Sequence, residues 1–193
     1  MQKSTDFLSL FRDSAAELKK LPSLVTAALL MALALILSSL GVYITPTLRI
    51  TFAFLANAVS AMLFGPAVAM LTGGLGDFLG YFLHPNGPFY PAYTVTAIVS
   101  GFLYGIFLYH RPVKLGWVIA AKSSVTLISN IFLNTLWGAM LYGKSFTALL
   151  PARIAKNLAL LPIEIAMLFL IAKAAQQIYE TSSHRFGTQK AAR

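Results

Sequence analysis

Residues 24–44, LVTAALLMALALILSSLGVYI, contain no charged side chain. A transmembrane helix needs about 20 such apolar residues. Similar apolar blocks recur as far as residue 172, and the chain of 193 residues is 58% hydrophobic but only 11% charged. An ordinary soluble domain carries about 25% charged residues. The sequence therefore predicts an integral membrane protein.

The apolar blocks predict six membrane spans, at residues 24–44, 50–64, 67–83, 93–109, 115–142 and 149–172. We expect all six to be helices, because a backbone in lipid must pair its own polar groups and no alternating β-barrel pattern is present. The predicted fold class is an all-α bundle. Gly65 and Pro66 separate two short spans without a polar linker, which predicts a tight hairpin at the cytoplasmic face.

Basic residues predict the orientation of the chain, because they are enriched in cytoplasmic loops. An even number of spans places both termini on one side, and that side also collects most basic residues: Lys3, Arg12, Lys19, Lys20, Arg111, Lys114, Lys173, Arg185, Lys190 and Arg193. We therefore expect both termini in the cytoplasm. The predicted parts are a cytoplasmic segment 1–23, a transmembrane domain 24–175 and a basic tail 176–193, which is expected to be loose from residue 180.

Polar side chains within the spans predict a cavity, since ionisable groups in a membrane are costly and usually face the bundle interior. The only acids there are Asp77 and Glu164. Two spans carry polar stripes. The stripe of residues 115–142 lies within about 120° of arc at 100° per residue and comprises Lys122, Thr126, Asn130, Asn134 and Trp137. The stripe of residues 149–172 comprises Arg153, Asn157 and Glu164. Facing each other, they would enclose a cavity that opens outward, near Arg49, Arg153 and Lys156.

Several of these residues also have a purely structural interpretation. Asn130 and Asn134 could tie helices together by hydrogen bonds. Lys122 is near the predicted cytoplasmic end of its span, so we expect it to snorkel toward water. Arg153 and Lys156 could anchor their helix at the membrane surface.

Aromatic residues beside the loop at 84–92 allow two interpretations. They could form an interfacial aromatic belt. Alternatively, three prolines and a glycine between 85 and 91 stiffen a segment that could act as a lid. The aromatic residues concerned are Tyr81, Phe89, Tyr90 and Tyr93.

The sequence gives little support to catalysis. The glycine-rich run at 73–80 has no following Lys-Ser/Thr and no preceding strand, so it is not a phosphate-binding loop. Gly76 and Gly80 instead predict close helix packing. Cysteine is absent, which excludes thiol chemistry, and the sequence contains no metal-binding or hydrolase motif. An intramembrane hydrolase using Ser100 and His84 is a weak alternative, and we predict that the chain is not an enzyme.

Seven short motifs follow one another in an order found in one transporter family. They are Ala28-Leu-Leu-Met-Ala32, Leu48-Arg-Ile-Thr-Phe52, Met62-Leu-Phe-Gly-Pro66, Gly76-Asp-Phe-Leu-Gly-Tyr81, Pro85-Asn-Gly-Pro-Phe-Tyr-Pro91, Pro151-Ala-Arg-Ile-Ala-Lys-Asn157 and Leu161-Pro-Ile-Glu164. Across nearly all of residues 24–172 the chain resembles the folate-specific branch of the S components of energy-coupling factor (ECF) vitamin transporters. It departs from the pattern at 55–57 and 91–93, near the predicted site.

The resemblance implies a six-helix S component that captures a vitamin outside the cell. It would dock on a transmembrane coupling protein that carries two ATPases, and Ala28 and Ala32 would form the docking surface. The chain contains no Walker motif and we expect no cofactor in it, because the partner ATPases would use the ATP.

Folate chemistry then suggests a role for each candidate residue. Asp77 or Glu164 would accept hydrogen bonds from adjacent N–H groups of the pteridine ring. Cations would hold the acidic glutamate tail, namely Arg49, Arg153 and Lys156. Aromatic rings would stack on the ligand, namely Phe89, Tyr93 and Trp137. The polar residues Asn130, Asn134 and Asn157 complete the predicted site.

Three alternatives stay open at this point. Asp77 could form an internal ion pair with Arg49 or Arg153 instead of binding ligand. The vitamin could be another compound, such as pantothenate or a pyrimidine. The chain could also be a homodimeric carrier in which Asp77 or Glu164 carries a coupling ion.

Overall fold

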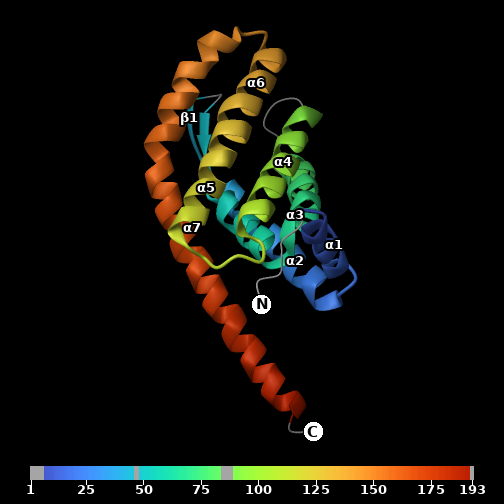
Figure 1. Ribbon diagram of the computed structural model, residues 1–193. Helices are drawn as coiled ribbons and strands as arrows, with labels where there is room; N and C mark the ends of the chain where they lie inside the picture. The colour runs from blue at the N-terminus through green and yellow to red at the C-terminus, as the bar shows by residue number, and fades with distance from the viewer. Residues whose placement is uncertain (1–6, 46–47, 84–88, 192–193) are drawn as a thin grey trace.

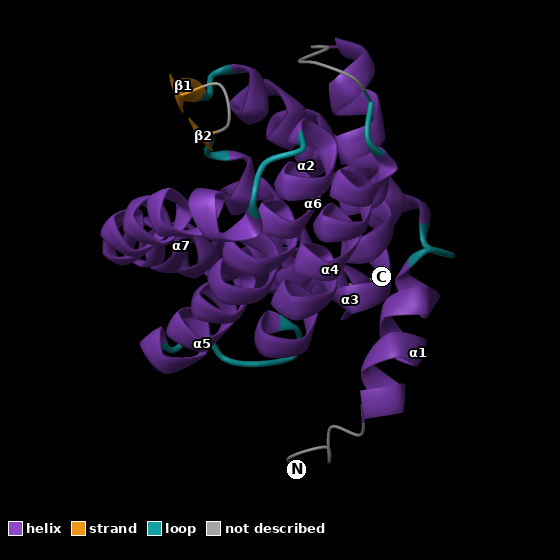
Figure 2. Cartoon of the chain, turned by 90° about the horizontal axis from the view of Figure 1, so that it is seen from above, coloured by secondary structure: helices purple, strands orange, loops and turns teal. Residues whose placement is uncertain are grey.

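The computed structural model describes residues 7–45, 48–83 and 89–191, and it is almost entirely helical in this part of the chain (Figures 1 and 2). Its elements are α1 (Phe7–Glu17), α2 (Leu21–Ser39), β1 (Val42–Thr45), β2 (Leu48–Ile50), α3 (Ala53–Leu83), α4 (Pro91–Leu108), α5 (Leu115–Val125), the π-helical segment η1 (Thr126–Leu133), α6 (Asn134–Tyr142) and α7 (Phe146–Ala191).

Five helical units of the described chain are long and apolar enough to cross a membrane: α2, α3, α4, the continuous unit Leu115–Tyr142, and α7 as far as Tyr179. The unit α3 contains two of the predicted spans, because its backbone leaves helical geometry at Gly65, with φ 83° and ψ −176°. Asn57 before this break and Asp77 after it line the same cavity, so the two halves of α3 fold back on each other. The six predicted spans are therefore all accounted for.

The break in α3 follows from its sequence. Glycine adopts a positive φ without steric cost, and Pro66 suits the first position of a helix, where a missing N–H loses no hydrogen bond. The next free amides of this half are capped by a residue from α1. Ser14 Oγ accepts hydrogen bonds from the amides of Ala67 and Val68, at 3.0 and 3.2 Å, and donates to the carbonyl of Phe64 at 2.6 Å.

Small residues allow the helices around α3 to pack closely. A methyl group on Gly101 of α4 would overlap the carbonyl of Ala69. The predicted role in close packing is confirmed for Gly80, where an added methyl group would lie 3.2 Å from Leu35 Cδ2 of α2, whereas at Gly76 it would meet Met31 Cγ at 3.5 Å, an ordinary contact. The tightest part of the bundle is thus formed by α2, α3 and α4.

The structure corrects three details of the sequence prediction. The span predicted to begin at residue 24 begins at Leu21, and its last residues form strand β1 instead of helix. The segment between the first two predicted spans, residues 45–49, belongs partly to the antiparallel hairpin β1–β2, in which Tyr43 pairs with Arg49. The tail expected to be loose from residue 180 continues α7 to Ala191.

The hairpin, the α6–α7 turn and the beginning of α4 lie at one end of the bundle (Figure 1). The α4–α5 connection and α1 lie toward the other end. Figure 2 shows the hairpin at the rim of the bundle. Side chains of α3, α4, η1 and α7 line a cavity between these elements, which contains the candidate site.

Candidate substrate-binding cavity

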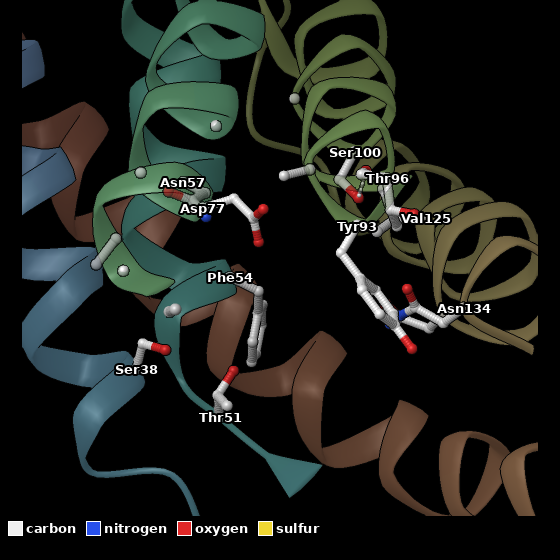
Figure 3. A pocket seen from close by; sticks show the side chains of 18 of the residues that line it. Ser38, Thr51, Phe54, Asn57, Asp77, Tyr93, Thr96, Ser100, Val125 and Asn134 are labelled. Atoms are coloured by element: carbon white, nitrogen blue, oxygen red, sulfur yellow. Dashed lines mark hydrogen bonds between the residues drawn. The ribbon is translucent and has the colours of Figure 1, made fainter. Parts of the chain in front are cut away.

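A cavity of about 560 Å³ lies within the bundle and receives side chains from α2, α3, α4, α5, η1, α6 and α7. This volume is in the range of sites for small organic ligands, about 300–1,000 Å³. Figure 3 shows Asp77 and Asn57 on one wall and Tyr93, Thr96 and Asn134 on the facing wall. The cavity therefore has polar groups on opposite sides.

The beginning of α7 contributes cationic side chains to the cavity. Arg153 and Lys156 both line it, together with Asn157. Arg153 is only 9% exposed; its guanidinium group forms a hydrogen bond with the hydroxyl of Tyr93 from α4. Asn157 Nδ2 donates to the carbonyl oxygen of Arg153 at 2.8 Å, which fixes this amide against its own helix. The cations thus belong to the cavity, as the stripe predicted.

Lys122 and Glu164 form an ion pair deeper in the cavity. Lys122 Nζ lies 3.1 Å from Glu164 Oε2 and 3.7 Å from the ring centroid of Phe54. The expected snorkelling of Lys122 is wrong, because this residue is 1% exposed. A buried ammonium group is costly unless it has a partner, and Glu164 from α7 provides one. Both residues line the cavity.

Asp77 lies on the α3 wall and points into the cavity (Figure 3). Its Oδ2 accepts a hydrogen bond of 2.7 Å from the hydroxyl of Thr94. Among the described side chains it forms no ion pair, which goes against the alternative pairing with Arg153. The side chain of Arg49, the other proposed partner, lies outside the described residues.

The polar stripe predicted for residues 115–142 is divided by the π-helical segment. Lys122, Asn130 and Asn134 line the cavity, whereas Thr126 and Trp137 do not. Trp137 Nε1 instead donates to Thr96 Oγ1 at 3.0 Å. A π-helix closes its hydrogen bonds at i→i+5 and so turns only about 80° per residue. Over the eight residues of η1, this slower turn keeps both asparagines in line with Lys122 and rotates Trp137 away.

The predicted aromatic residues Phe89 and Tyr93 both line the cavity, as does Tyr90. Phe89 also packs against Tyr81, with ring centroids 5.0 Å apart, and against Phe78 at 5.8 Å. The prolines and glycine of the lid hypothesis lie mostly at residues 85–88, which are outside the described residues, as is His84 of the hydrolase alternative.

Sequence reasoning missed three residues near the site: Phe54, Thr94 and Tyr104. Phe54 gave no signal within its apolar run. Tyr104 could have been found, because Tyr93, Ala97, Ser100 and Tyr104 recur at helical spacing on α4 and all line the cavity. Ser100, the weak candidate nucleophile, donates its hydroxyl to the carbonyl of Thr96 at 2.8 Å.

The predicted docking residues Ala28 and Ala32 are exposed on α2. Larger apolar residues beside them are exposed as well, including Leu29 at 66% and Leu33 at 45%. This face of α2 turns away from α3, and small residues at its centre permit close approach of another helix.

The fold and the cavity define a membrane-embedded binding protein, and comparisons with known proteins give its class. Residues 22–172 match the family model "ECF transporter, substrate-specific component", and the chain belongs to this family. The members of this family are components of transporters, so the enzyme alternative is not supported. Multiple membrane spans are consistent with this membership.

Individual relatives within the family are more specific. The chain is 31% identical over 152 residues to the folate transporter FolT of Clostridium novyi, which covers 79% of this chain and 88% of that protein. It is 34% identical over 154 residues to the folate transporter FolT of Leuconostoc mesenteroides, covering 76% of this chain and 82% of that protein. A crystal structure of FolT bound with folic acid superposes with a TM-score of 0.75 at 28% identity, covering 80% of this chain and 95% of that chain.

Proposed function

We propose that this S component binds folate in the cavity described above and serves as the substrate-capturing subunit of an ATP-driven ECF transporter. The observation that carries the proposal is that one cavity contains cations at the beginning of α7 and hydrogen-bonding groups further along it. Folate has the matching polarity, with an acidic glutamate at one end and a hydrogen-bonding ring at the other. The similarity to proteins named folate transporter FolT supports the same ligand.

Arg153 and Lys156 hold the glutamate tail in this proposal. Both cations line the cavity near the beginning of α7, and charge-assisted hydrogen bonds to carboxylates are stronger than neutral ones. Arg49 of β2 is a further candidate for the tail, from the sequence pattern alone. The side-chain amides of Asn130, Asn134 and Asn157 also line the cavity and provide hydrogen-bonding groups for the ligand.

Aromatic residues bind the flat parts of the ligand. Tyr93 and Phe89 line the cavity beside the cations, where they can stack on the aminobenzoyl ring that joins the pteridine to the glutamate. Trp137 is not part of this set, because its indole is directed to Thr96.

The exposed face of α2 docks on the energy-coupling module. Ala28 and Ala32 form the contact with a transmembrane coupling protein, and two ATPase subunits consume the ATP. With the termini in the cytoplasm, the cavity end near Arg153 faces outward and receives vitamin from outside the cell. The unequal distribution of basic residues supports this orientation.

Binding by the purified chain tests the proposal. Calorimetry or native mass spectrometry with folic acid should give tight one-to-one binding, and the controls riboflavin and pantothenate should not bind. Binding of either control in place of folic acid would assign the chain to another vitamin. Uptake in reconstituted vesicles that required an ion gradient but no ATPase partner would support the carrier alternative instead.

A further inference from the structure

The deep part of the cavity contains a buried hydroxyl group to which no role has been given. Tyr104 of α4 lines the cavity and is 1% exposed. Its hydroxyl has no hydrogen-bond partner among the described residues. Buried polar groups are nearly always hydrogen-bonded, so an unpartnered one at a cavity wall points to a bound molecule.

Two charged groups line the same cavity as this hydroxyl. They are Glu164 of α7 and Lys122 of α5. Glu164 Oε2 lies 3.1 Å from Lys122 Nζ, and that ammonium group lies 3.7 Å from the centre of the Phe54 ring. The ion pair and the ring hold both charged groups in place. The deep part of the cavity thus offers two donors, from Tyr104 and Lys122, beside one carboxylate acceptor.

We propose that Tyr104, Lys122 and Glu164 form a subsite that reads the polar edge of the pteridine ring, an inference that rests on the proposed function. This edge presents a carbonyl oxygen, a ring N–H and an amino group in succession. The carbonyl oxygen accepts from Tyr104 and Lys122. The ring N–H and the amino group donate to the Glu164 carboxylate, which can accept such a pair.

The order of groups along α7 agrees with this placement. Arg153 and Glu164 are eleven positions apart, which is about 16 Å at 1.5 Å per helical residue. Folate carries its glutamate and the polar edge of its ring at opposite ends. A ligand held by Arg153 through its tail therefore brings its ring to Glu164.

Asp77 is the rival acid, and the structure gives it a different environment. Its carboxylate already accepts a hydrogen bond from Thr94, and among the described side chains no cation pairs with it. The ring edge needs donors and an acceptor side by side, and the group around Glu164 provides both. Asp77 then forms part of the cavity wall beside the ring.

The experiment measures affinity for three ligands: folic acid, pteroic acid, which lacks the glutamate, and p-aminobenzoylglutamate, which lacks the pteridine. Tyr104→Phe removes only the hydroxyl. We expect it to weaken the affinities for folic acid and pteroic acid about tenfold, which corresponds to a loss of about 1.4 kcal/mol. The affinity for p-aminobenzoylglutamate should not change. Arg153→Gln should weaken the affinities for folic acid and p-aminobenzoylglutamate but not the affinity for pteroic acid. If the tail fragment binds too weakly to measure, pteroic acid alone decides.

A matched control separates ligand binding from general effects of a buried hydroxyl. Thr126→Val removes another buried hydroxyl without a described partner, in a residue that does not line the cavity, and it should leave all three affinities unchanged. Unaltered pteroic acid binding by Tyr104→Phe overturns the subsite while folic acid binding by the unmodified chain still stands. Failure of the unmodified chain to bind folic acid overturns the proposed function itself.

An analogue of folic acid without the 2-amino group tests which acid reads the ring. The unmodified chain should prefer folic acid to this analogue, and Asp77→Asn should retain the preference. Glu164→Gln should abolish it. If Asp77→Asn lost this preference and Glu164→Gln retained it, Asp77 would be the acid that binds the ring, and the role of Glu164 would be overturned.

Discussion

Individual side chains provide the partners that the buried polar groups of this bundle need. Lys122 is buried inside the bundle and paired with Glu164, and Arg153 is hydrogen-bonded to Tyr93 at the cavity wall. Ser14 does the same for the backbone, since it pairs three main-chain groups at the break in α3. Each of these side chains satisfies groups that lipid cannot.

Ser14→Ala tests the capping role. The substitution leaves the amides of Ala67 and Val68 and the carbonyl of Phe64 without this partner in a buried position. An unsatisfied buried group costs about 1–3 kcal/mol, so we expect a clearly lower thermal transition of the purified protein. The matched control is Ser39→Ala, which removes an exposed hydroxyl bonded to Ile36 and should have little effect. Equal transitions for the two variants would mean that α1 does not support the break.

At the scale of elements, η1 shows why the predicted polar stripe wrongly included Trp137. The prediction used 100° per residue throughout, and this value holds for α5 and α6 but not for the π-helical turn between them. Asn130 and Asn134 reach the cavity and Trp137 does not. Nothing in the apolar run from Thr126 to Leu133 distinguishes a π-helix from an α-helix, so the shift could not be derived from the sequence.

Cysteine labelling can test this helical phase directly, because the chain contains no cysteine of its own. Asn130→Cys and Asn134→Cys should react with a water-soluble maleimide, and folic acid should slow both reactions several-fold. Trp137→Cys should show no such protection. Protection of Trp137→Cys as well as of Asn130→Cys and Asn134→Cys would mean that the helix is α-helical throughout. An exposed control position is Lys144, beyond the end of α6.

At the scale of the whole molecule, the sequence predicted the membrane class, the spans and most of the cavity, because these depend on apolar length and helical spacing. Asp77, Arg153, Lys156 and Glu164 reach the cavity as expected. The contacts of Lys122 and Thr94 were not predictable, since they depend on which helices become neighbours in space. The β1–β2 hairpin was missed because its residues extend an apolar run.

The docking face of α2 can be tested independently of the cavity. Ala28 is exposed and lies outside the cavity lining, so Ala28→Trp should leave folic acid affinity unchanged. The bulky ring should prevent the close helix contact that small residues permit. We therefore expect the variant to lose copurification with the coupling protein and to lose uptake. Normal uptake by Ala28→Trp would place the docking surface elsewhere, and Thr26→Trp serves as a control on the same helix.

The serine cap at the α3 break also sets an order of events during synthesis. Ser14 leaves the ribosome well before Phe64, its partner 50 positions further along the chain. Until α2 and the first half of α3 have been inserted, the amides after Pro66 have no cap from α1. The N-terminal helix α1 can therefore dock on the bundle only after the first half of α3 has been inserted, which is late in assembly. An N-terminal fusion that keeps α1 away from the bilayer would leave the rest of the protein inserted but incompletely closed.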